Sequence, residues 1–364
     1  MGAGGSQRLE NATQTQNRFA QLILTLTRKI CSQAAMRFAR FPAVPLLAAL
    51  ALGVAARAAD AVPARLERTV YAMGTSLRID AEGPSEDGLR QATESAFRES
   101  ERIEAACSTW RPDSSWSRLN QAKGAEVALD REWLDLLGTV LSWTKRTDGA
   151  FDPVLGALLR AWGIRTGGRT PSEEELAHAR AASGARLLFL DPGQGAARLG
   201  HPEAALDEGG FLKGYALDRM ARLLVAGGVR DAVLDFGGQL LVLGRPRPVS
   251  LSAPDDRHRA TLGFVLRPGS LSSSGTSEHG RHILDPHTGL RSPAWGSVSV
   301  VASDGLTADI LSTALYALGP ERGLAWANAN DVAAVFQRPN RPALQSRRAQ
   351  DLGLHPATRS ENPG

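Results

Sequence analysis

Cysteine is almost absent from this sequence, which has two cysteines among 364 residues. Cys31 belongs to a segment that we expect to be missing from the mature protein, so Cys107 would be the single remaining thiol. One thiol can form neither an intramolecular disulfide nor a metal site built on thiolates. Metal chemistry, if the protein performs any, must therefore use oxygen ligands.

Aromatic residues are also scarce, at 5% of the chain, although the sequence pI is about 9.4. The arginines that make the chain basic are scattered, and many lie in the tail at 338–359. Nucleic-acid-binding surfaces gather their basic residues and often interleave them with aromatic side chains. The pattern here indicates a solvated basic surface instead, and we expect no nucleic-acid partner.

The apolar run at 41–56 is too short for a permanent membrane helix, which needs about 20 residues. It follows the basic stretch 36–40 and precedes Ala56-Arg57-Ala58. This arrangement predicts a secretory signal peptide over 36–58, with cleavage after Ala58. We therefore expect a periplasmic or otherwise exported protein. The alternative is an uncleaved segment that anchors the chain in the inner membrane. We interpret residues 1–35 as a spurious extension from an upstream start codon that the cell does not use.

Removal of 58 residues leaves 364 − 58 = 306, enough for a substantial core. Apolar spacing predicts helices at about 86–106, 131–147, 210–226 and 307–318, the last one ending at Gly319-Pro320. Strands are expected at 70–80 with a break at Gly74, at 186–199 as a pair, at 232–236 and 239–243 as a hairpin or a bulged strand, and at 298–302. Helices and strands alternate without a regular βαβ repeat, which indicates an α+β fold. The folded domain should cover 65–337, and 338–364 is predicted to be a disordered tail.

The segment 206–218, LDEGGFLKGYALD, places two glycines at the start of a predicted helix, with Lys213 one turn in. Free backbone N–H groups, the positive end of the helix dipole and a cation suit a phosphate. The segment is not a Walker A loop, because Gly214 stands where Ser or Thr is required. A tight turn with a surface lysine is the alternative interpretation.

The segment 307–313, TADILST, spaces Asp309 and Thr313 four residues apart. On a helix both side chains project from one face. A carboxylate and a hydroxyl are suitable ligands for Mg²⁺, which keeps waters and binds phosphate oxygens. The local alternative is an aspartate that stabilises the helix dipole and a threonine that bonds its own backbone.

Two further segments are candidates for chemistry. In 281–289, RHILDPHTG, His282 and Asp285 surround a proline turn, and a histidine beside phosphate chemistry is a candidate general base. A turn with a solvent-facing histidine is the alternative. In 147–163, Asp152-Pro153 marks a turn, while Phe151 and Trp162 fit a core equally well.

These segments belong to a longer series of motifs in a fixed order. The series is M-G-T at 73–75, S-T-W-R-P-D-S at 108–114, L-N at 119–120, D-G-A-F-D-P at 148–153, L-D-x-G-G-x-x-K-G-Y-A-x-D at 206–218, F-G-G at 236–238, S-S-G at 273–275, H-I-L-D-P-x-T-G at 282–289 and A-D-x-x-x-T at 308–313. In this order the chain resembles the ApbE family, the FAD:protein FMN transferases, from about Thr69 to Phe336. The resemblance implies a T-fold-related α+β architecture of mixed sheets flanked by helices, with the FAD and Mg²⁺ site in a cleft between two lobes.

The resemblance also implies roles for individual residues. Mg²⁺ would be held by Asp309, Thr313 and the backbone carbonyl of Gly210, and His282 would be the general base. Lys213 would bind the substrate and assist catalysis. The FAD pocket would comprise Met73, Trp110, Ala150, Phe151, Asp152, Asp207, Lys213 and Ile283.

Three features depart from the family pattern. Glu278-His279 stand where a tyrosine often follows the S-G pair. Glu208 stands where a small or apolar residue is usual, and it adds negative charge beside the metal loop. Trp110 replaces the commoner tyrosine, which still permits stacking on a flat ring.

The expected reaction is Mg²⁺-dependent transfer of FMN from FAD to a threonine hydroxyl of an acceptor protein, with release of AMP. The acceptor would be an exported or membrane redox protein. One alternative is Mg²⁺-dependent hydrolysis of FAD to FMN and AMP, in which water replaces the threonine. Another is a flavin-binding protein without catalytic activity.

Overall fold

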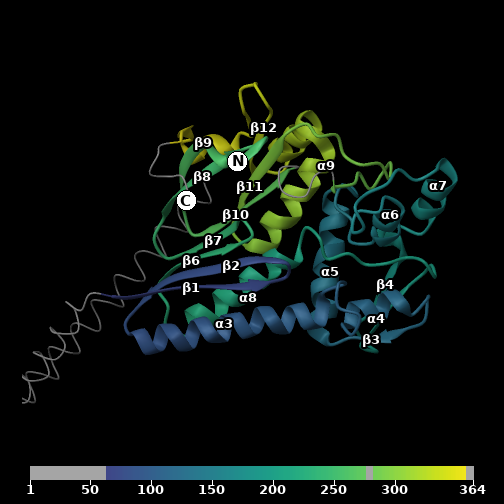
Figure 1. Cartoon of the computed structure of the whole chain (residues 1–364), viewed down its shortest axis with the longest axis horizontal. Helices are drawn as coiled ribbons and strands as arrows, with labels where there is room; N and C mark the ends of the chain where they lie inside the picture. Colours follow the sequence, from purple (N-terminus) through teal and green to yellow (C-terminus); the bar gives the residue numbers. More distant parts are fainter. Residues whose placement is uncertain (1–62, 276–281, 358–364) are drawn as a thin grey trace, which may run out of the picture. The chain divides into compact units, whose positions relative to one another are not determined.

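The computed structural model describes residues 63–275 and 282–357 (Figure 1). The predicted extension at 1–35 and the predicted signal peptide at 36–58 lie outside the described residues, as does the end of the tail from 358 onward. Within the described ranges, no helix is both long and apolar enough to cross a membrane.

The largest sheet has eight strands in the order β1-β2-β6-β7-β10-β11-β12-β13, and every neighbouring pair is antiparallel. Its first two strands form a hairpin around the two-residue turn Met73-Gly74, where both residues have positive φ. Such a turn matches the twist of antiparallel strands. The strand bounds are β1 Ala64–Ala72, β2 Thr75–Gly83, β6 Asp231–Phe236, β7 Gln239–Leu243, β10 Gly269–Gly275, β11 Ser297–Ala302, β12 Ala333–Gln337 and β13 Leu344–Gln345.

Alternate residues of this sheet face two different cores, because successive side chains of a strand point to opposite faces. In β12, Ala334 and Phe336 belong to the larger core, whereas Ala333 and Val335 belong to the second one. The larger core is shared with helices α3 (Glu86–Cys107), α8 (Leu212–Ala226) and α9 (Gly305–Ala329). Helix α3 lies beside β1 and β2, α8 lies against β6 and β7, and α9 lies beside β10 and β11 (Figure 1).

The second core lies between the large sheet and a three-stranded sheet of order β14-β9-β8. Val249 and Leu251 of β8 and Phe264 of β9 supply its apolar side chains from this sheet. The bounds are β8 Arg247–Ala253, β9 Asp256–Leu266 and β14 His355–Pro356. The large sheet is therefore covered by helices on one face and by strands on the other.

The third sheet, of order β3-β5-β4, belongs to the chain between α3 and α8. Helices α4 and α5 contact it, while α6 and α7 pack against each other. The loops of this region carry several of the predicted motifs. The bounds are α4 Ser115–Gln121, β3 Val127–Ala128, α5 Arg131–Arg146, α6 Gly156–Ala161, α7 Glu173–Ala181, η1 Ala185–Leu187, β4 Leu188–Asp191 and β5 Ala196–Leu199.

The predicted α+β class is confirmed, and the four predicted helices correspond to α3, α5, α8 and α9. The helix predicted to end at Gly319-Pro320 does break there, with Gly319 at φ 80° and ψ 169°. A helical segment then resumes from Pro320 and reaches Ala329. Proline fits the first turn of the resumed segment because that position needs no backbone donor.

The prediction of a disordered tail from 338 onward was wrong for residues 338–357. Leu344 and Gln345 pair with β12, and His355 and Pro356 pair with β9. Between these strands the short helix η2, Arg348–Leu352, buries Ala349 completely. The composition of the tail is polar, but strand pairing and the buried Ala349 attach it to the rest of the fold.

Candidate functional site

The start of α8 and one face of α9 meet at very short range. A Cβ built on Gly210 would lie 2.6 Å from Thr313 Oγ1, so the backbone of Gly210 abuts that hydroxyl. One turn further, the backbone N–H of Gly214 donates to Asp309 Oδ2 at 3.0 Å. Gly210, Asp309 and Thr313, the three predicted metal ligands, are thus brought together at one junction.

Asp309 is buried at this junction, with only 5% of the residue exposed. Burial raises the pKa of its carboxyl, and the positive charge of Lys213 and the hydrogen bond from Gly214 oppose that rise. Among the described residues, Lys213 has no hydrogen-bond or ion-pair partner, although it acts on Asp309 through its charge. A buried carboxylate without a direct cationic partner is costly, so this position is suited to binding a cation.

The donor set fits Mg²⁺. A carboxylate, a hydroxyl and the backbone of Gly210 are all oxygen donors, which this ion prefers. In the part of the chain that the structure describes, no group of three or more His, Cys, Asp or Glu residues could hold a metal. Such a sparse set is typical of sites where substrate phosphates and water complete the coordination of Mg²⁺.

Two serines of β10, one in the S-S-G motif and one just before it, contact α9 from the sheet. Ser312 Oγ lies 3.2 Å from Ser272 Oγ and 3.0 Å from Ser274 Oγ, and it donates to the carbonyl of Asp309 at 3.0 Å. Ser312 is fully buried. Hydroxyl groups in place of apolar side chains hold α9 in register with β10, so Asp309 and Thr313 are held at a fixed position.

Two aspartates cap the N-terminus of α9. Asp218 of α8 accepts from Gly305 N at 2.6 Å and from Leu306 N at 2.9 Å, while Asp304 accepts from Thr307 N at 2.8 Å. Burial raises the pKa of Asp218 to about 6. Asp218, the final residue of the 206–218 motif, therefore stabilises the contact between α8 and α9, the helix that carries Asp309.

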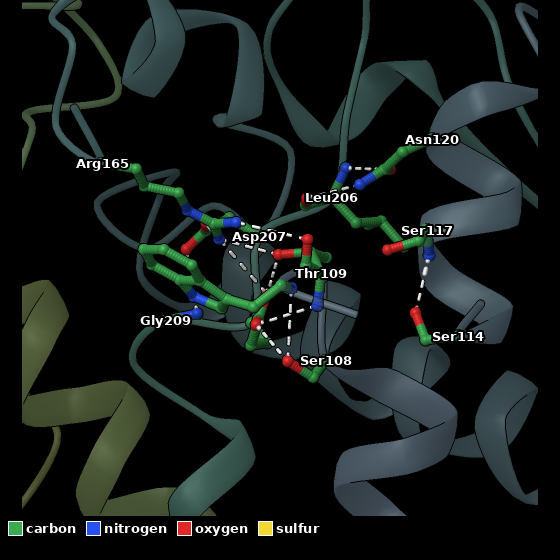
Figure 2. Close-up of polar contacts among 11 residues, drawn as sticks. Ser108, Thr109, Ser114, Ser117, Asn120, Arg165, Leu206, Asp207 and Gly209 are labelled. Carbon is green, nitrogen blue, oxygen red and sulfur yellow. Dashed lines mark hydrogen bonds and ion pairs between the residues drawn. The ribbon is translucent and has the colours of Figure 1, made fainter. Parts of the chain in front are cut away.

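A second polar cluster surrounds Trp110, whose residue is 66% exposed. The guanidinium of Arg165 lies 4.3 Å from the centre of the Trp110 ring. It donates to Asp207 Oδ2 at 2.5 Å and to Thr109 Oγ1 at 2.7 Å. Figure 2 shows Arg165 pointing toward Thr109 and Asp207 from a different segment of the chain. Trp110 and Asp207, both predicted FAD residues, are thus connected through Arg165.

Glu208 points into the same cluster. Its Oε1 accepts from Thr109 N at 2.9 Å, its Oε2 accepts from Thr109 Oγ1, and Arg165 Nη2 lies 3.6 Å away. Burial is the main reason that the pKa of Glu208 is raised, and the charge of Asp207 adds to it. The unusual carboxylate therefore ties the 108–110 turn to the glycine loop.

The L-N motif holds the irregular segment that leads into the glycine loop. Asn120 Nδ2 donates to the carbonyl of Leu206 at 3.0 Å, and Leu206 N donates to Asn120 Oδ1 at 2.7 Å (Figure 2). This pair of bonds uses both ends of one amide side chain, so the backbone just before Asp207 has a single arrangement.

The D-G-A-F-D-P segment is largely internal. Ala150 and Phe151 are buried in the larger core, and the ring of Phe151 packs edge-on against Phe211 at 6.1 Å. Asp152 accepts from Val154 N at 2.8 Å and from Ala185 N at 2.7 Å, and burial raises its pKa. The side chains of these predicted FAD residues shape the loop, and their contact with FAD stays a prediction.

The remaining predicted residues lie on two hairpins. Met73, in the β1–β2 turn, donates its N–H to Glu104 Oε2 at 3.0 Å. His282 is partly buried, and Ile283 is 9% exposed in the larger core. Leu284 and Arg291 form a bridge that closes the turn after them. The roles of His282 and Ile283 stay predictions.

The loop at 148–153 and the turn at 282–291 are neighbours, which the sequence did not indicate. A Cβ on Gly149 would lie 3.2 Å from His287 Cε1, and Trp162 Nε1 donates to the carbonyl of Gly289 at 2.8 Å. Arg165, close to Trp162 in the chain, was missed as well. It lies in a turn without periodicity, and only the unusual acidic pair Asp207-Glu208 could have pointed to a basic partner.

The ApbE family model matches residues 73–336. A protein of Rhodobacter capsulatus named FAD:protein FMN transferase is 32% identical over 294 residues, which cover 76% of this chain and 56% of that protein. One of Vibrio cholerae with the same name is 28% identical over 256 residues, or 65% of this chain and 76% of the other. The crystal structure of the ApbE protein from Thermotoga maritima superposes with a TM-score of 0.72 at 25% identity, covering 79% of this chain and 99% of that one.

Proposed function

The chain belongs to the ApbE family, and from this premise we propose that it transfers the FMN part of FAD to a threonine hydroxyl of an acceptor protein. AMP is the other product. Relatives named FAD:protein FMN transferase support the flavin chemistry, and the threonine target is inferred from the family resemblance.

The observation that carries the proposal is the junction of α8 and α9. Gly210 abuts Thr313, and Gly214 bonds Asp309, so a helix N-terminus faces an oxygen-rich pair of ligands. Phosphates bind at helix N-termini because free N–H groups and the helix dipole favour negative charge. The diphosphate of FAD would lie between this N-terminus and a cation held by Asp309, Thr313 and the backbone of Gly210.

Each residue of the site then has a defined task. Asp309, Thr313 and the backbone of Gly210 would hold Mg²⁺, which would supply positive charge to compensate the diphosphate and the leaving AMP. Lys213 adds a second positive charge from the first turn of α8. Trp110 offers an exposed ring for stacking, and Asp207 is positioned by Arg165 beside it.

The transfer exchanges one phosphorus–oxygen bond for another. The acceptor threonine loses its hydroxyl proton to His282, and its oxygen forms a bond to the FMN phosphorus. The bond from that phosphorus to the bridging oxygen breaks, and AMP leaves with that oxygen. Positioning and electrostatics contribute most of the rate in reactions of this type.

The cellular setting is part of the same proposal. The basic, apolar and small-residue pattern of 36–58 supports export, which would place the enzyme in the periplasm. Exported or membrane redox proteins with an accessible threonine are then the acceptors to test.

The direct test incubates the mature chain with FAD, Mg²⁺ and candidate exported redox proteins. A mass gain of one FMN per acceptor, with an equal amount of AMP, is the expected result. An acceptor variant without the threonine should gain no mass. Free FMN and AMP without a modified acceptor would replace the proposal with FAD hydrolysis. Tight FAD binding without any AMP would replace it with a flavin-binding role.

A further inference from the structure

Arg165 connects three segments that are far apart in the sequence. Its donors reach Thr109, just after α3, and Asp207, just before α8. Its carbon Cζ lies 4.3 Å from the ring centre of Trp110. Its side chain is 30% exposed, so most of the guanidinium is committed to these partners. The arginine is therefore part of the built cluster and not a freely solvated cation.

The first consequence concerns the ring of Trp110. Arg165 covers one face of the indole, yet the residue remains 66% exposed. A guanidinium stacked on an indole is attracted by the ring and restricts its rotation. The exposed part of Trp110 is thereby held in one orientation, which suits the stacking of a planar ligand ring.

The second consequence concerns charge. Asp207 and Glu208 place two carboxyl groups side by side directly before the glycines that would receive a diphosphate. Arg165 lies 2.5 Å from Asp207 and 3.6 Å from Glu208, so it compensates both. Without that cation, the acidic pair would repel an anionic dinucleotide.

We propose that Arg165 is a positioning residue for FAD, which fixes the stacking ring of Trp110 and neutralises the acidic pair Asp207-Glu208. The inference rests on the proposed function, because it assumes that FAD is the substrate. It explains why this chain tolerates Glu208 beside the metal loop. The acid ties the loop to Thr109, and the arginine compensates its charge.

The proposal is tested by FAD kinetics of R165M, R165K and the double variant R165M/E208Q, at saturating Mg²⁺ and acceptor. R165M should raise the KM for FAD about tenfold or more, while kcat changes by less than about threefold. R165K keeps the charge without the planar stack and should give an intermediate KM. R165M/E208Q should recover part of the lost affinity, because it removes the anion that Arg165 compensated.

R111M is the matched control. Arg111 follows Trp110 in the same turn, and its ion pair with Asp113 at 3.6 Å is exposed. Loss of this charge should leave the KM for FAD within about twofold of the wild-type value. A comparable rise in R111M would mean that general surface charge, and not Arg165, sets FAD affinity.

Two outcomes would overturn the proposal. One is an unchanged KM in R165M, and the other is a double variant no better than R165M. A melting temperature far below that of the wild type would show that R165M does not fold. In that case the KM values for FAD of R165K and E208Q are compared with the wild-type value instead. Failure of the proposed function is distinguishable, because the wild-type enzyme would then leave the acceptor protein unmodified, whether or not it releases AMP from FAD.

Discussion

The backbone N–H of Gly214 donates to Asp309 Oδ2 at 3.0 Å, so the first turn of α8 touches the carboxylate of α9 directly. This contact exists because neither helix has a side chain in the way. A Cβ on Gly214 would lie 2.2 Å from the carbonyl oxygen of Gly305, and one on Gly305 would lie 2.4 Å from the carbonyl oxygen of Gly214. The two glycines allow a helix–helix approach that places the N-terminus of α8 against Asp309 and Thr313, the predicted metal ligands of α9.

Replacement of Gly214 by alanine should therefore force the two helices apart. We expect the free energy of unfolding to fall by about 1–3 kcal/mol, the range for an overpacked core. The transfer rate should fall as well, because Asp309 and Gly210 would no longer keep their spacing. Urea unfolding and FAD-dependent AMP release measure the two effects.

Gly138→Ala is the matched control for that substitution. Gly138 lies on the exposed side of α5, and a Cβ there would meet nothing within 4 Å. Alanine in a helix interior is favoured over glycine by up to about 1 kcal/mol, so this variant should be equally stable or more stable. A similar loss in both variants would contradict the close-contact explanation.

The sequence predicted that Asp309 and Thr313 share one face of a helix, because that spacing follows from helix geometry. Their role as metal ligands stays a prediction. Asp309 and Thr313 are four residues apart on a predicted helix, and the glycine pair marks the start of another. The contact between these two helices is a tertiary contact, which the local sequence pattern does not predict. The contact between these helices depends on Gly214 and Gly305, because a side chain on either glycine would clash with the backbone of the other.

Other parts of the site depend on contacts that no local pattern reports. Arg165 and Asp207 are 42 residues apart, and the turn that carries Arg165 has no periodicity. Phe151 could be interpreted as a core or a pocket residue, and the structure places it in the core against Phe211. The tail was predicted to be disordered because most of its residues are polar. Leu344 pairs with β12, and Ala349 is buried in the second core, and both contacts are made with strands distant in the sequence.

A hydrogen-bonded ion cluster joins three helices behind the site. Glu132 of α5 accepts from Tyr215 of α8 at 2.6 Å and from Arg102 of α3 at 2.8 Å. Tyr215→Phe should lower the free energy of unfolding by about 1 kcal/mol, since a hydrogen bond to a charged but partly exposed group is lost. Chemical denaturation at neutral pH measures it.

Tyr71→Phe removes the same hydroxyl from a residue that is 79% exposed. Its effect should stay within about 0.5 kcal/mol. Equal effects of the two substitutions would argue that the Tyr215–Glu132 bond contributes nothing to the packing of α5 against α8.

The raised pKa of Asp218 makes stability depend on pH. Burial raises this pKa from the usual value of 3.8 to about 6. Between these values the folded protein holds a proton that the unfolded chain has lost, so stability falls as the pH rises from about 4 to 6. Asp218→Asn should remove this contribution, which is at most about 1.4 kcal/mol per pH unit.

Unfolding curves of wild type and Asp218→Asn across pH 4–7 provide the measurement. The difference between their unfolding free energies should shift in favour of the variant up to about pH 6 and then become constant. Parallel curves over the whole range would show that Asp218 titrates as in the unfolded chain.

Asp309→Asn separates the metal role of this residue from its role in folding. The amide keeps the shape of the side chain and an oxygen that can accept from Gly214, but it removes the charge. We expect transfer at saturating FAD to fall by at least about 100-fold, as for loss of a key electrostatic group. Asp309→Ala should abolish Mg²⁺-dependent transfer. Because the buried carboxylate has a raised pKa, its neutral replacement by Asn should leave the melting temperature unchanged or higher.

Asp304→Asn provides the comparison on the same helix. Asp304 caps α9 through Thr307 N, and asparagine is an equally good cap, so both stability and transfer should be retained. The assays are AMP release as a function of Mg²⁺ concentration and thermal unfolding of each variant. Full activity of Asp309→Asn at every Mg²⁺ concentration would remove Asp309 from the metal site. Loss of activity together with a large fall in melting temperature would instead assign it a purely structural role.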